Sequence, residues 1–181
     1  MTEHGELGIE LEENDSYILE LLNSDLGNVH QINHREREKE FNNYKFTSKT
    51  SILRVYSKKI VEDLFSNGIV FRKTYDKEFP RVEKKYFFHF LRGFMDGDGC
   101  ISNNVLSFTG ANRDFFEYLR NFILEEFSFK SGIYKEKENK YRLIFNKSET
   151  KKILPRIYHN CGSHCLQRKK ALYLGSPPRK L

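Results

Sequence analysis

The sequence has no tryptophan, only three cysteines and four prolines, and no long apolar run. Without an apolar segment of about 18–20 residues, a membrane-spanning helix is excluded. The acidic stretch 1–14 resembles neither a signal peptide nor a transit peptide. An odd, small number of cysteines without a secretion signal argues against a disulfide scaffold. We therefore expect an intracellular protein, cytoplasmic or organellar, with no membrane partner.

Phenylalanine and tyrosine are abundant instead, with 16 and 10 copies among 181 residues. This supply of large apolar side chains is sufficient for a folded core, and it excludes a chain that is disordered throughout. The length suits one domain or two small lobes. The formal net charge of +6 favours a polyanionic partner only weakly, because net charge alone says little about binding.

Two parts of the chain show the same order of expected elements. In the first, apolar spacing predicts a strand over 6–11, a helix from Tyr17 to Gly27, two strands within 30–49, a strand over 51–56 and a helix over 57–65. In the second, it predicts a strand over 105–109, a helix capped by 112–114, a hairpin of 133–137 with 140–145, and a helix opening at Thr150 with Pro155 in its first turn. We interpret this as a duplication, with lobes over 1–80 and 81–174 and a loose tail over 175–181.

The segment between the two parts occurs only once. Apolar residues from Phe87 to Met95 predict a helix that runs into Asp96-Gly97-Asp98-Gly99. Acidic side chains are disfavoured at the negative end of a helix dipole, so a nearby cation would relieve the repulsion. Carboxylate and carbonyl oxygens are the ligands that Mg²⁺ prefers. On these four residues alone, however, a plain Asp-Gly turn is the simpler interpretation.

Residues Leu91 to Gly99 resemble the LAGLIDADG motif in its variant that ends Asp-Gly-Asp-Gly, with Arg92 where that family usually has a small residue. The resemblance implies an α+β, homing-endonuclease-like fold. In that fold αββαββα units are related by a pseudo-two-fold axis, and their saddle-shaped antiparallel sheets lie along the DNA major groove. The elements after Gly99 fit one full unit, and the first part fits a unit that lacks its opening helix.

The first part starts just after the position of an expected first motif. Leu7 corresponds to Leu106 and Ile9 to Phe108, in each pair 99 residues apart. Either the chain is a fragment, or it is complete and the family's activity has decayed. We expect truncation, because the first part keeps good strand and helix patterning. In both cases self-association or a partner would have to supply the missing motif helix.

For the site, the resemblance implies that Asp98 binds a divalent metal, Mg²⁺ or Mn²⁺, with the carbonyl of Gly97 in reach of it. Lys73 and Lys169 are the nearest equivalents of a basic residue that the family places near the metal. Phosphodiester hydrolysis agrees with this set, because it needs metals held by carboxylates and a cation that stabilises phosphate charge.

The remaining motif positions are implied to be structural. Asp96 corresponds to the acid that ends the helix, and Leu91, Gly93 and Gly99 to packing positions of the motif. A glycine inside a helix costs about 1 kcal/mol relative to alanine. Gly93 therefore predicts the close approach of another backbone.

Basic residues on the two expected sheets are candidates for DNA contact. Arg35 and Arg37 share one face of a strand within a run of mixed charge. The second hairpin carries Lys135, Lys137, Lys140 and Arg142, with Tyr134 and Tyr141 between them. Basic residues on an exposed sheet contact phosphates and base edges in the major groove. For any single residue, a solubilising surface explains the charge equally well.

We therefore expect a site-specific DNA endonuclease of the homing type that binds double-stranded DNA. A non-cleaving DNA-binding protein of the same fold, such as a maturase or a transcription regulator, is the alternative. A third class is an interaction module whose sheet faces a protein. The cluster His159, Cys161, His164 and Cys165 could suit zinc, but it lacks a second half at finger spacing. A loop with partly buried thiols is the favoured interpretation there.

Overall fold

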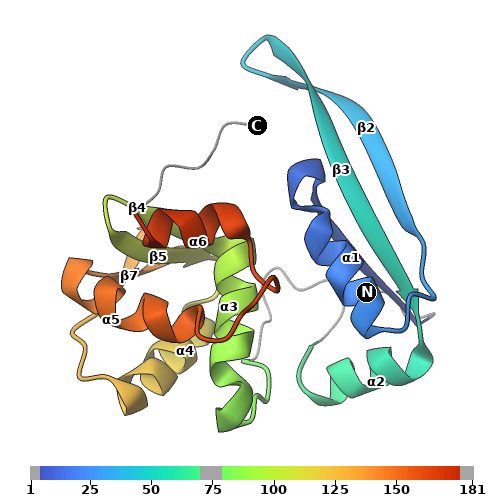
Figure 1. Cartoon of the computed structure of the whole chain (residues 1–181). Helices are drawn as coiled ribbons and strands as arrows, with labels where there is room; N and C mark the ends of the chain where they lie inside the picture. Colours follow the sequence, from blue (N-terminus) through green and yellow to red (C-terminus); the bar gives the residue numbers. More distant parts are fainter. Residues whose placement is uncertain (1–4, 70–78, 176–181) are drawn as a thin grey trace. The chain divides into compact units, whose positions relative to one another are not determined.

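The computed structural model describes residues 5–69 and 79–175 (Figure 1). The chain forms two compact units, Met1–Phe65 and Ser66–Leu181. The elements of the first unit are β1 (Glu6–Glu12), η1 (Glu13–Asp15), α1 (Tyr17–Asp25), β2 (Ile32–Phe41), β3 (Tyr44–Tyr56) and α2 (Lys58–Ser66). Those of the second are η2 (Lys84–Tyr86), α3 (Phe87–Asp98), β4 (Gly99–Ser102), β5 (Val105–Gly110), α4 (Arg113–Glu126), β6 (Gly132–Lys137), β7 (Lys140–Phe145), α5 (Lys147–Ile157) and α6 (Gln167–Tyr173).

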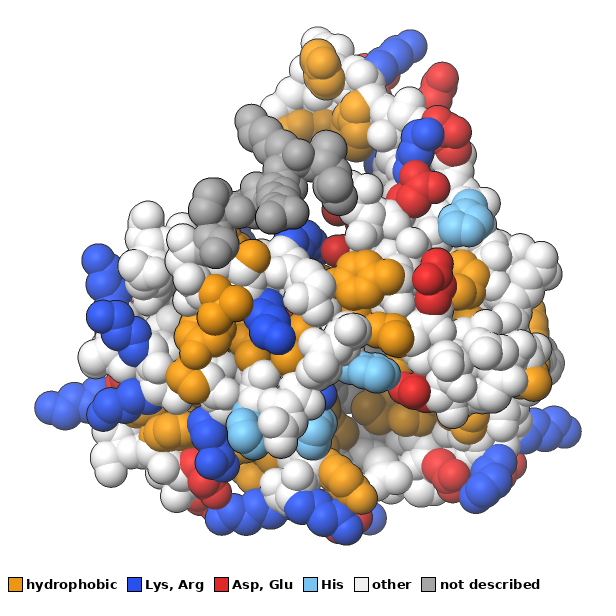
Figure 2. Space-filling model, in the orientation of Figure 1, with side chains coloured by type: hydrophobic (Ala, Val, Ile, Leu, Met, Phe, Trp, Pro, Cys, Tyr) orange, Lys and Arg blue, Asp and Glu red, His pale blue; other side chains and the backbone are white. Residues whose placement is uncertain are grey.

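None of the helices within residues 5–69 and 79–175 is long and apolar enough to cross a membrane. On the face of the molecule drawn in Figure 2, lysine and arginine side chains are dispersed, with acidic side chains among them. The net positive charge is therefore not gathered in one block on that face. Any basic surface has to be found strand by strand, from the way side chains alternate between the faces of each sheet.

The first unit is a three-stranded antiparallel sheet in the order β1-β3-β2. Its small core joins Leu19 of α1 to Leu53 and Val55 of β3. Together with the antiparallel sheet and helices of the second unit, this sheet confirms the expected α+β fold class.

The strands predicted within 30–56 were divided wrongly. Residues 32–56 form one long hairpin, in which β3 is a single strand of 13 residues. The turn lies at Asn42 and Asn43, whose φ values of 49° and 63° are left-handed. Asparagine tolerates this backbone better than most residues and suits a two-residue hairpin turn. The charged run has no apolar alternation that would mark where its strands end.

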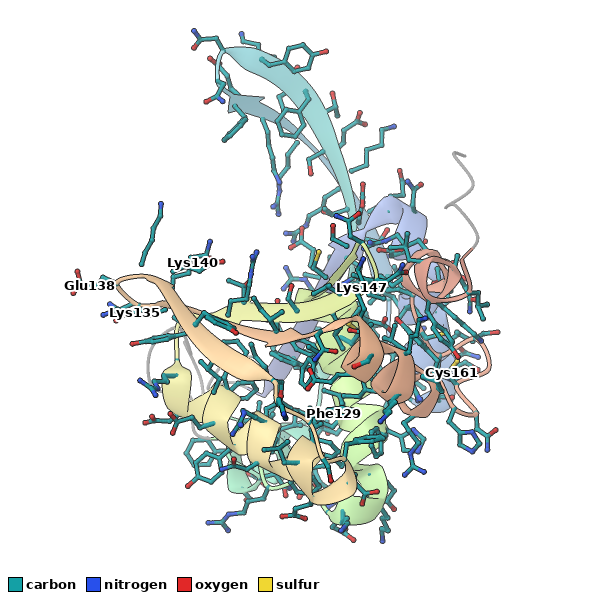
Figure 3. The ribbon with its side chains drawn as sticks, turned by 90° about the vertical axis from the view of Figure 1, so that its left-hand side faces the viewer. Phe129, Lys135, Glu138, Lys140, Lys147 and Cys161 are labelled. Carbon is teal, nitrogen blue, oxygen red and sulfur yellow. The ribbon has the colours of Figure 1, made fainter. Side chains whose placement is uncertain are left out.

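The second unit is a four-stranded antiparallel sheet in the order β4-β5-β7-β6. Leu106 and Phe108 of β5 and Leu143 and Phe145 of β7 are fully buried. They pack in one core with side chains of α3, α4 and α5, and Figures 1 and 3 show these helices on one side of the sheet. In each unit, we call the outer face the face of the sheet that is turned away from the helices and core of that same unit.

Helix α5 begins three residues earlier than the prediction at Thr150. Asn146 is its N-cap: its side chain accepts hydrogen bonds from the backbone of Ser148 and Glu149, and Glu149 bonds back to the backbone of Asn146. Pro155 consequently lies near the C-terminal end and not in the first turn. Proline has no N–H to donate to the carbonyl of Lys151, an exposed residue where water can replace that bond. The capping box was the missed signal.

Candidate functional site

The motif segment forms α3 and the first strand of the second sheet. Helix α3 continues through Asp98, and β4 starts at Gly99 without an intervening loop. Leu91 and Met95 are fully buried, whereas Gly97 and Asp98 are exposed. A Cβ at Gly99 would lie 2.7 Å from the Met95 carbonyl oxygen and 2.9 Å from its Cα. Only glycine therefore allows the strand to follow the helix so directly.

Lys169 of α6 closes the C-terminal end of α3. Its Nζ donates to the carbonyl oxygens of Met95 at 2.8 Å, Asp96 at 2.7 Å and Gly99 at 2.7 Å. An ammonium group has three donors, and all of them are used here. The side chain is buried, and this burial lowers the pKa of the ammonium group. The cation expected near this helix end is thus a lysine that meets the negative end of the helix dipole.

Asp96 ties α3 to the loop between α5 and α6. Its Oδ2 accepts a hydrogen bond from the backbone N–H of Leu166 at 2.9 Å, and its Oδ1 accepts one from the Tyr158 hydroxyl at 3.5 Å. Burial raises the pKa of the Asp96 carboxyl, and the Leu166 N–H and the Lys169 charge partly oppose that rise. The pKa of Tyr158 is raised as well, by burial and by the neighbouring carboxylate.

This raised pKa predicts a pH dependence of stability. The folded protein binds a proton at Asp96 more readily than the unfolded chain, whose carboxyl keeps its ordinary value near 3.8. The stability that Asp96 contributes should therefore increase as the pH falls through the folded pKa, and level off below 3.8. In urea denaturation between about pH 7 and pH 4, the wild type should gain stability relative to Asp96→Asn. A stability difference between the two proteins that stays constant as the pH falls, or a loss of wild-type stability relative to Asp96→Asn, would contradict this prediction.

Lys169 binds neither the Asp98 carboxylate nor the Gly97 carbonyl, which lie at the same end of α3. Both are hard donors of the kind that Mg²⁺ and Mn²⁺ accept, so the residues fit part of a metal site. Among the described residues, however, no three His, Cys, Asp or Glu side chains come together as a metal cluster. The second unit thus offers a single carboxylate, that of Asp98, to a metal ion at this end of α3. The zinc alternative at Cys161 and Cys165 lacks a ligand set for the same reason.

One motif position, Gly93, differs from expectation, and Lys73 lies outside the described residues. No atom in the described part of the chain comes within 4 Å of a Cβ built at Gly93, so the predicted close backbone approach is not found there. Arg92 is buried, donating to the Ile157 carbonyl at 3.3 Å and bonding His89 Nδ1 at 2.9 Å. The large residue is accommodated because it points into its own unit.

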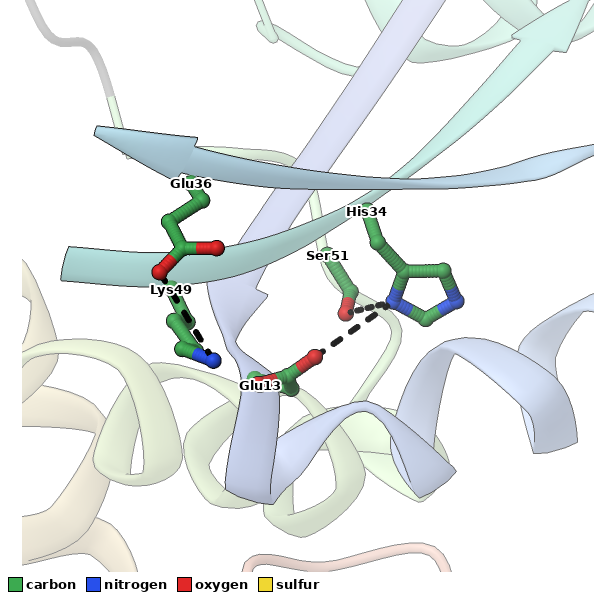
Figure 4. A network of polar contacts seen from close by, with 5 residues as sticks. All are labelled: Glu13, His34, Glu36, Lys49 and Ser51. Atoms are coloured by element: carbon green, nitrogen blue, oxygen red, sulfur yellow. Dashed lines mark hydrogen bonds and ion pairs between the residues drawn. The ribbon is translucent and has the colours of Figure 1, made fainter. Parts of the chain in front are cut away.

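In the first sheet, strand register sorts the mixed charges of β2. Arg35, Arg37 and Lys39 pair with Thr50, Ser48 and Phe46, and this set lies on the outer face. His34, Glu36, Glu38 and Glu40 lie on the opposite face. There His34 Nδ1 and Ser51 Oγ are 2.9 Å apart, and Glu36 forms an ion pair with Lys49 (Figure 4). Within β2, the run that looks mixed in the sequence therefore places its cations on one face and its acidic side chains on the other, and on the outer face Arg37 also forms an ion pair with Glu10 of β1 at 3.5 Å.

The hairpin of the second sheet divides its basic residues between its faces. Tyr134, Lys137, Lys140 and Arg142 share the outer face with Glu136, whose carboxylate lies 2.8 Å from Lys140 Nζ and 3.0 Å from Arg142 Nε. Lys135 pairs with Tyr141 on the other face, and a bulge separates it from Lys137. Figure 3 shows Lys135 and Lys140 at the far end of this hairpin. The four basic residues expected together thus do not form one surface.

Residues 86–158 match the family model described as a LAGLIDADG-like domain. The structure of I-DmoI in complex with DNA and Mn is similar, with a TM-score of 0.54, 13% identity, and 86% of this chain and 81% of that chain covered. The meganuclease I-SmaMI bound to uncleavable DNA gives a TM-score of 0.57 at 13% identity, covering 93% and 75%. Full-length DUF199/WhiA from Thermatoga maritima gives a TM-score of 0.53 at 15% identity, and the match covers 94% of this chain and 51% of that chain. No curated protein sequence matches the chain.

Proposed function

Residues 86–158 match the model of a LAGLIDADG-like domain, and from this premise we propose that the chain binds double-stranded DNA through the outer faces of its two sheets. We further propose that Asp98 and the Gly97 carbonyl hold a divalent cation for phosphodiester hydrolysis. In this proposal, cleavage requires a second motif helix to bring another acid.

The observation that carries the proposal is the sorting of charge in β2. Three cationic side chains at alternate positions, Arg35, Arg37 and Lys39, follow one face of the strand. Beyond Thr50, where the pairing with β1 ends, β2 and β3 continue as a ribbon of two strands. The DNA major groove admits a two-stranded ribbon, and cations on such a ribbon neutralise phosphates.

Removing these three charges should weaken DNA binding about 10- to 100-fold at about 0.1 M salt, and lower the slope of log affinity against log salt by about 3. The variant is Arg35→Gln, Arg37→Gln and Lys39→Gln, measured by fluorescence anisotropy with a labelled duplex. The matched control is Lys147→Gln, Lys151→Gln and Lys152→Gln, an equal change of charge on exposed positions of α5. Equal losses of DNA affinity in both variants, or no loss in the first, would refute the assignment of Arg35, Arg37 and Lys39 to DNA binding.

For hydrolysis, a divalent cation at Asp98 would activate water and stabilise the leaving oxygen. Asp98 contributes the negative charge that holds it, and its exposure leaves the carboxylate accessible to a phosphate from outside the unit. Gly93 and Gly97 stand one turn apart on α3 with open space beside them in the described residues. A second motif helix, from another copy or from a partner, would fit against these two glycines.

A non-cleaving DNA-binding protein is the second candidate, and Lys169 favours it. All three of its N–H donors are bonded to backbone carbonyls, so none is free for a phosphate. Among the described residues, α3 also brings only one exposed acid to its end. In this function the fold would bind DNA and hold it without breaking it. A cleavage assay with Mg²⁺ or Mn²⁺ separates the two candidates.

A further inference from the structure

The loop between α5 and α6 brings two cysteines into contact. Cys161 and Cys165 are both buried, and their Sγ atoms are 3.2 Å apart. A turn holds them there: the backbone N–H of His164 donates to the Cys161 carbonyl at 2.9 Å, and Gly162 has a left-handed φ of 53°. The contact thus belongs to a folded turn and does not depend on a chance approach of two side chains.

The two sulfur atoms have different surroundings. Lys170 Nζ lies 3.3 Å from Cys161 Sγ, where its positive charge stabilises the negative charge of an attacking sulfur. Burial and the hydrogen bond with Cys161 raise the pKa of the Cys165 thiol to about 12. The Lys170 contact therefore marks Cys161 as the nucleophile and Cys165 as the thiol that completes the disulfide. The third cysteine, Cys100, is exposed.

We propose that Cys161 and Cys165 form a reversible disulfide when the protein meets a hydroperoxide. The Cys161 sulfur attacks the terminal peroxide oxygen and breaks the O–O bond, which gives a sulfenic acid and releases water or an alcohol. The Cys165 sulfur then displaces the hydroxyl from Cys161, which leaves as water with the thiol proton, and the S–S bond forms. The two thiols supply two electrons and two protons, and the peroxide accepts them.

This bond would act on the end of the motif helix. Leu166 follows Cys165 directly, and its N–H donates to Asp96. Tyr158, three residues before Cys161, also contacts Asp96. Pulling the two sulfur atoms to bonding distance therefore shifts the segment that holds this carboxylate. The inference does not depend on DNA binding, so its failure and that of the proposed function are separate results.

The test uses the full chain with Cys100→Ser, so that only the two loop cysteines remain. After treatment with hydrogen peroxide, unfolding and alkylation, we expect a mass lower by two hydrogen atoms and no alkylated cysteine. Reduction with dithiothreitol should restore both alkylation sites. Two alkylated thiols after treatment, or stepwise addition of oxygen atoms without disulfide, would overturn the proposal.

Replacing Lys170 provides a second test, because the rate of disulfide formation would not depend on this lysine if the two thiols were merely packed together. Lys170→Gln should slow disulfide formation several-fold, whereas Lys151→Gln, at an exposed position of α5, should leave the rate unchanged. Circular dichroism shows whether each variant is folded. In Cys165→Ser the reaction should stop at the Cys161 sulfenic acid, which dimedone traps. Equal rates in both lysine variants, or no trapped sulfenic acid, would contradict the assigned roles.

Discussion

Replacing Lys169 with methionine is expected to lower the free energy of unfolding by about 2–4 kcal/mol. Methionine has nearly the same shape as the lysine stem but no donor. The carbonyls of Met95, Asp96 and Gly99 would lose a charged partner at a place where the lysine side chain is only 8% exposed. A hydrogen bond to a charged group contributes about 1.5–3 kcal/mol, and a buried acceptor left unsatisfied costs about as much. The melting temperature should fall by about 10 °C.

The matched control is Lys151→Met, the same chemical change at an exposed position of α5. Surface substitutions of this kind change stability by about 0.5 kcal/mol or less. Urea denaturation followed by circular dichroism measures both variants. If Lys169→Met is as stable as the control, water satisfies the three carbonyls, and the lysine does not hold the end of α3. The same measurement is needed before any loss of activity in a Lys169 variant is attributed to chemistry.

The sequence identified Lys169 as a candidate basic residue near the motif. It did not predict that this lysine binds the backbone carbonyls at the end of α3. Its acceptors are three backbone carbonyls 70, 73 and 74 residues earlier in the chain. Backbone acceptors carry no side-chain signal, so a sequence pattern shows only a lysine late in the chain. From the helix that ends in acidic residues we predicted a divalent metal ion nearby; in the structure Lys169 supplies a positive charge at that end, and the metal stays a prediction.

Strand faces were easier to predict than strand ends. The alternation of Arg35, Arg37 and Lys39 with acidic residues places them on one face in any extended conformation, and the register agrees. The length of the hairpin was missed because Asn42-Asn43 lies inside a polar run, where a turn and an exposed strand have similar composition. The bulge that separates Lys135 from Lys137 is likewise set by pairing with β7, which single-strand patterns do not show.

Replacing Asp98 with asparagine is expected to abolish metal-dependent DNA cleavage while leaving DNA binding unchanged within about twofold. Asparagine keeps the size of the side chain but removes the charge that would hold a divalent cation. Because a divalent cation held there would activate water and stabilise the leaving oxygen, its loss should lower the cleavage rate by about a thousandfold or more. Asp98 is exposed, so the variant should fold normally.

Asp96→Asn is the matched control, because it makes the same change two residues away at a carboxylate that bonds Leu166 and Tyr158. It should retain cleavage wherever the wild type cleaves.

Since α3 supplies one exposed acid per chain among the described residues, a second copy that completes the site would make the rate rise with the square of protein concentration. In a concentration range where analytical ultracentrifugation shows the protein to be monomeric, a rate proportional to concentration would place the second acid elsewhere. Wild-type protein that binds DNA with a steep salt dependence, yet never cuts it with Mg²⁺ or Mn²⁺, would identify the non-cleaving function.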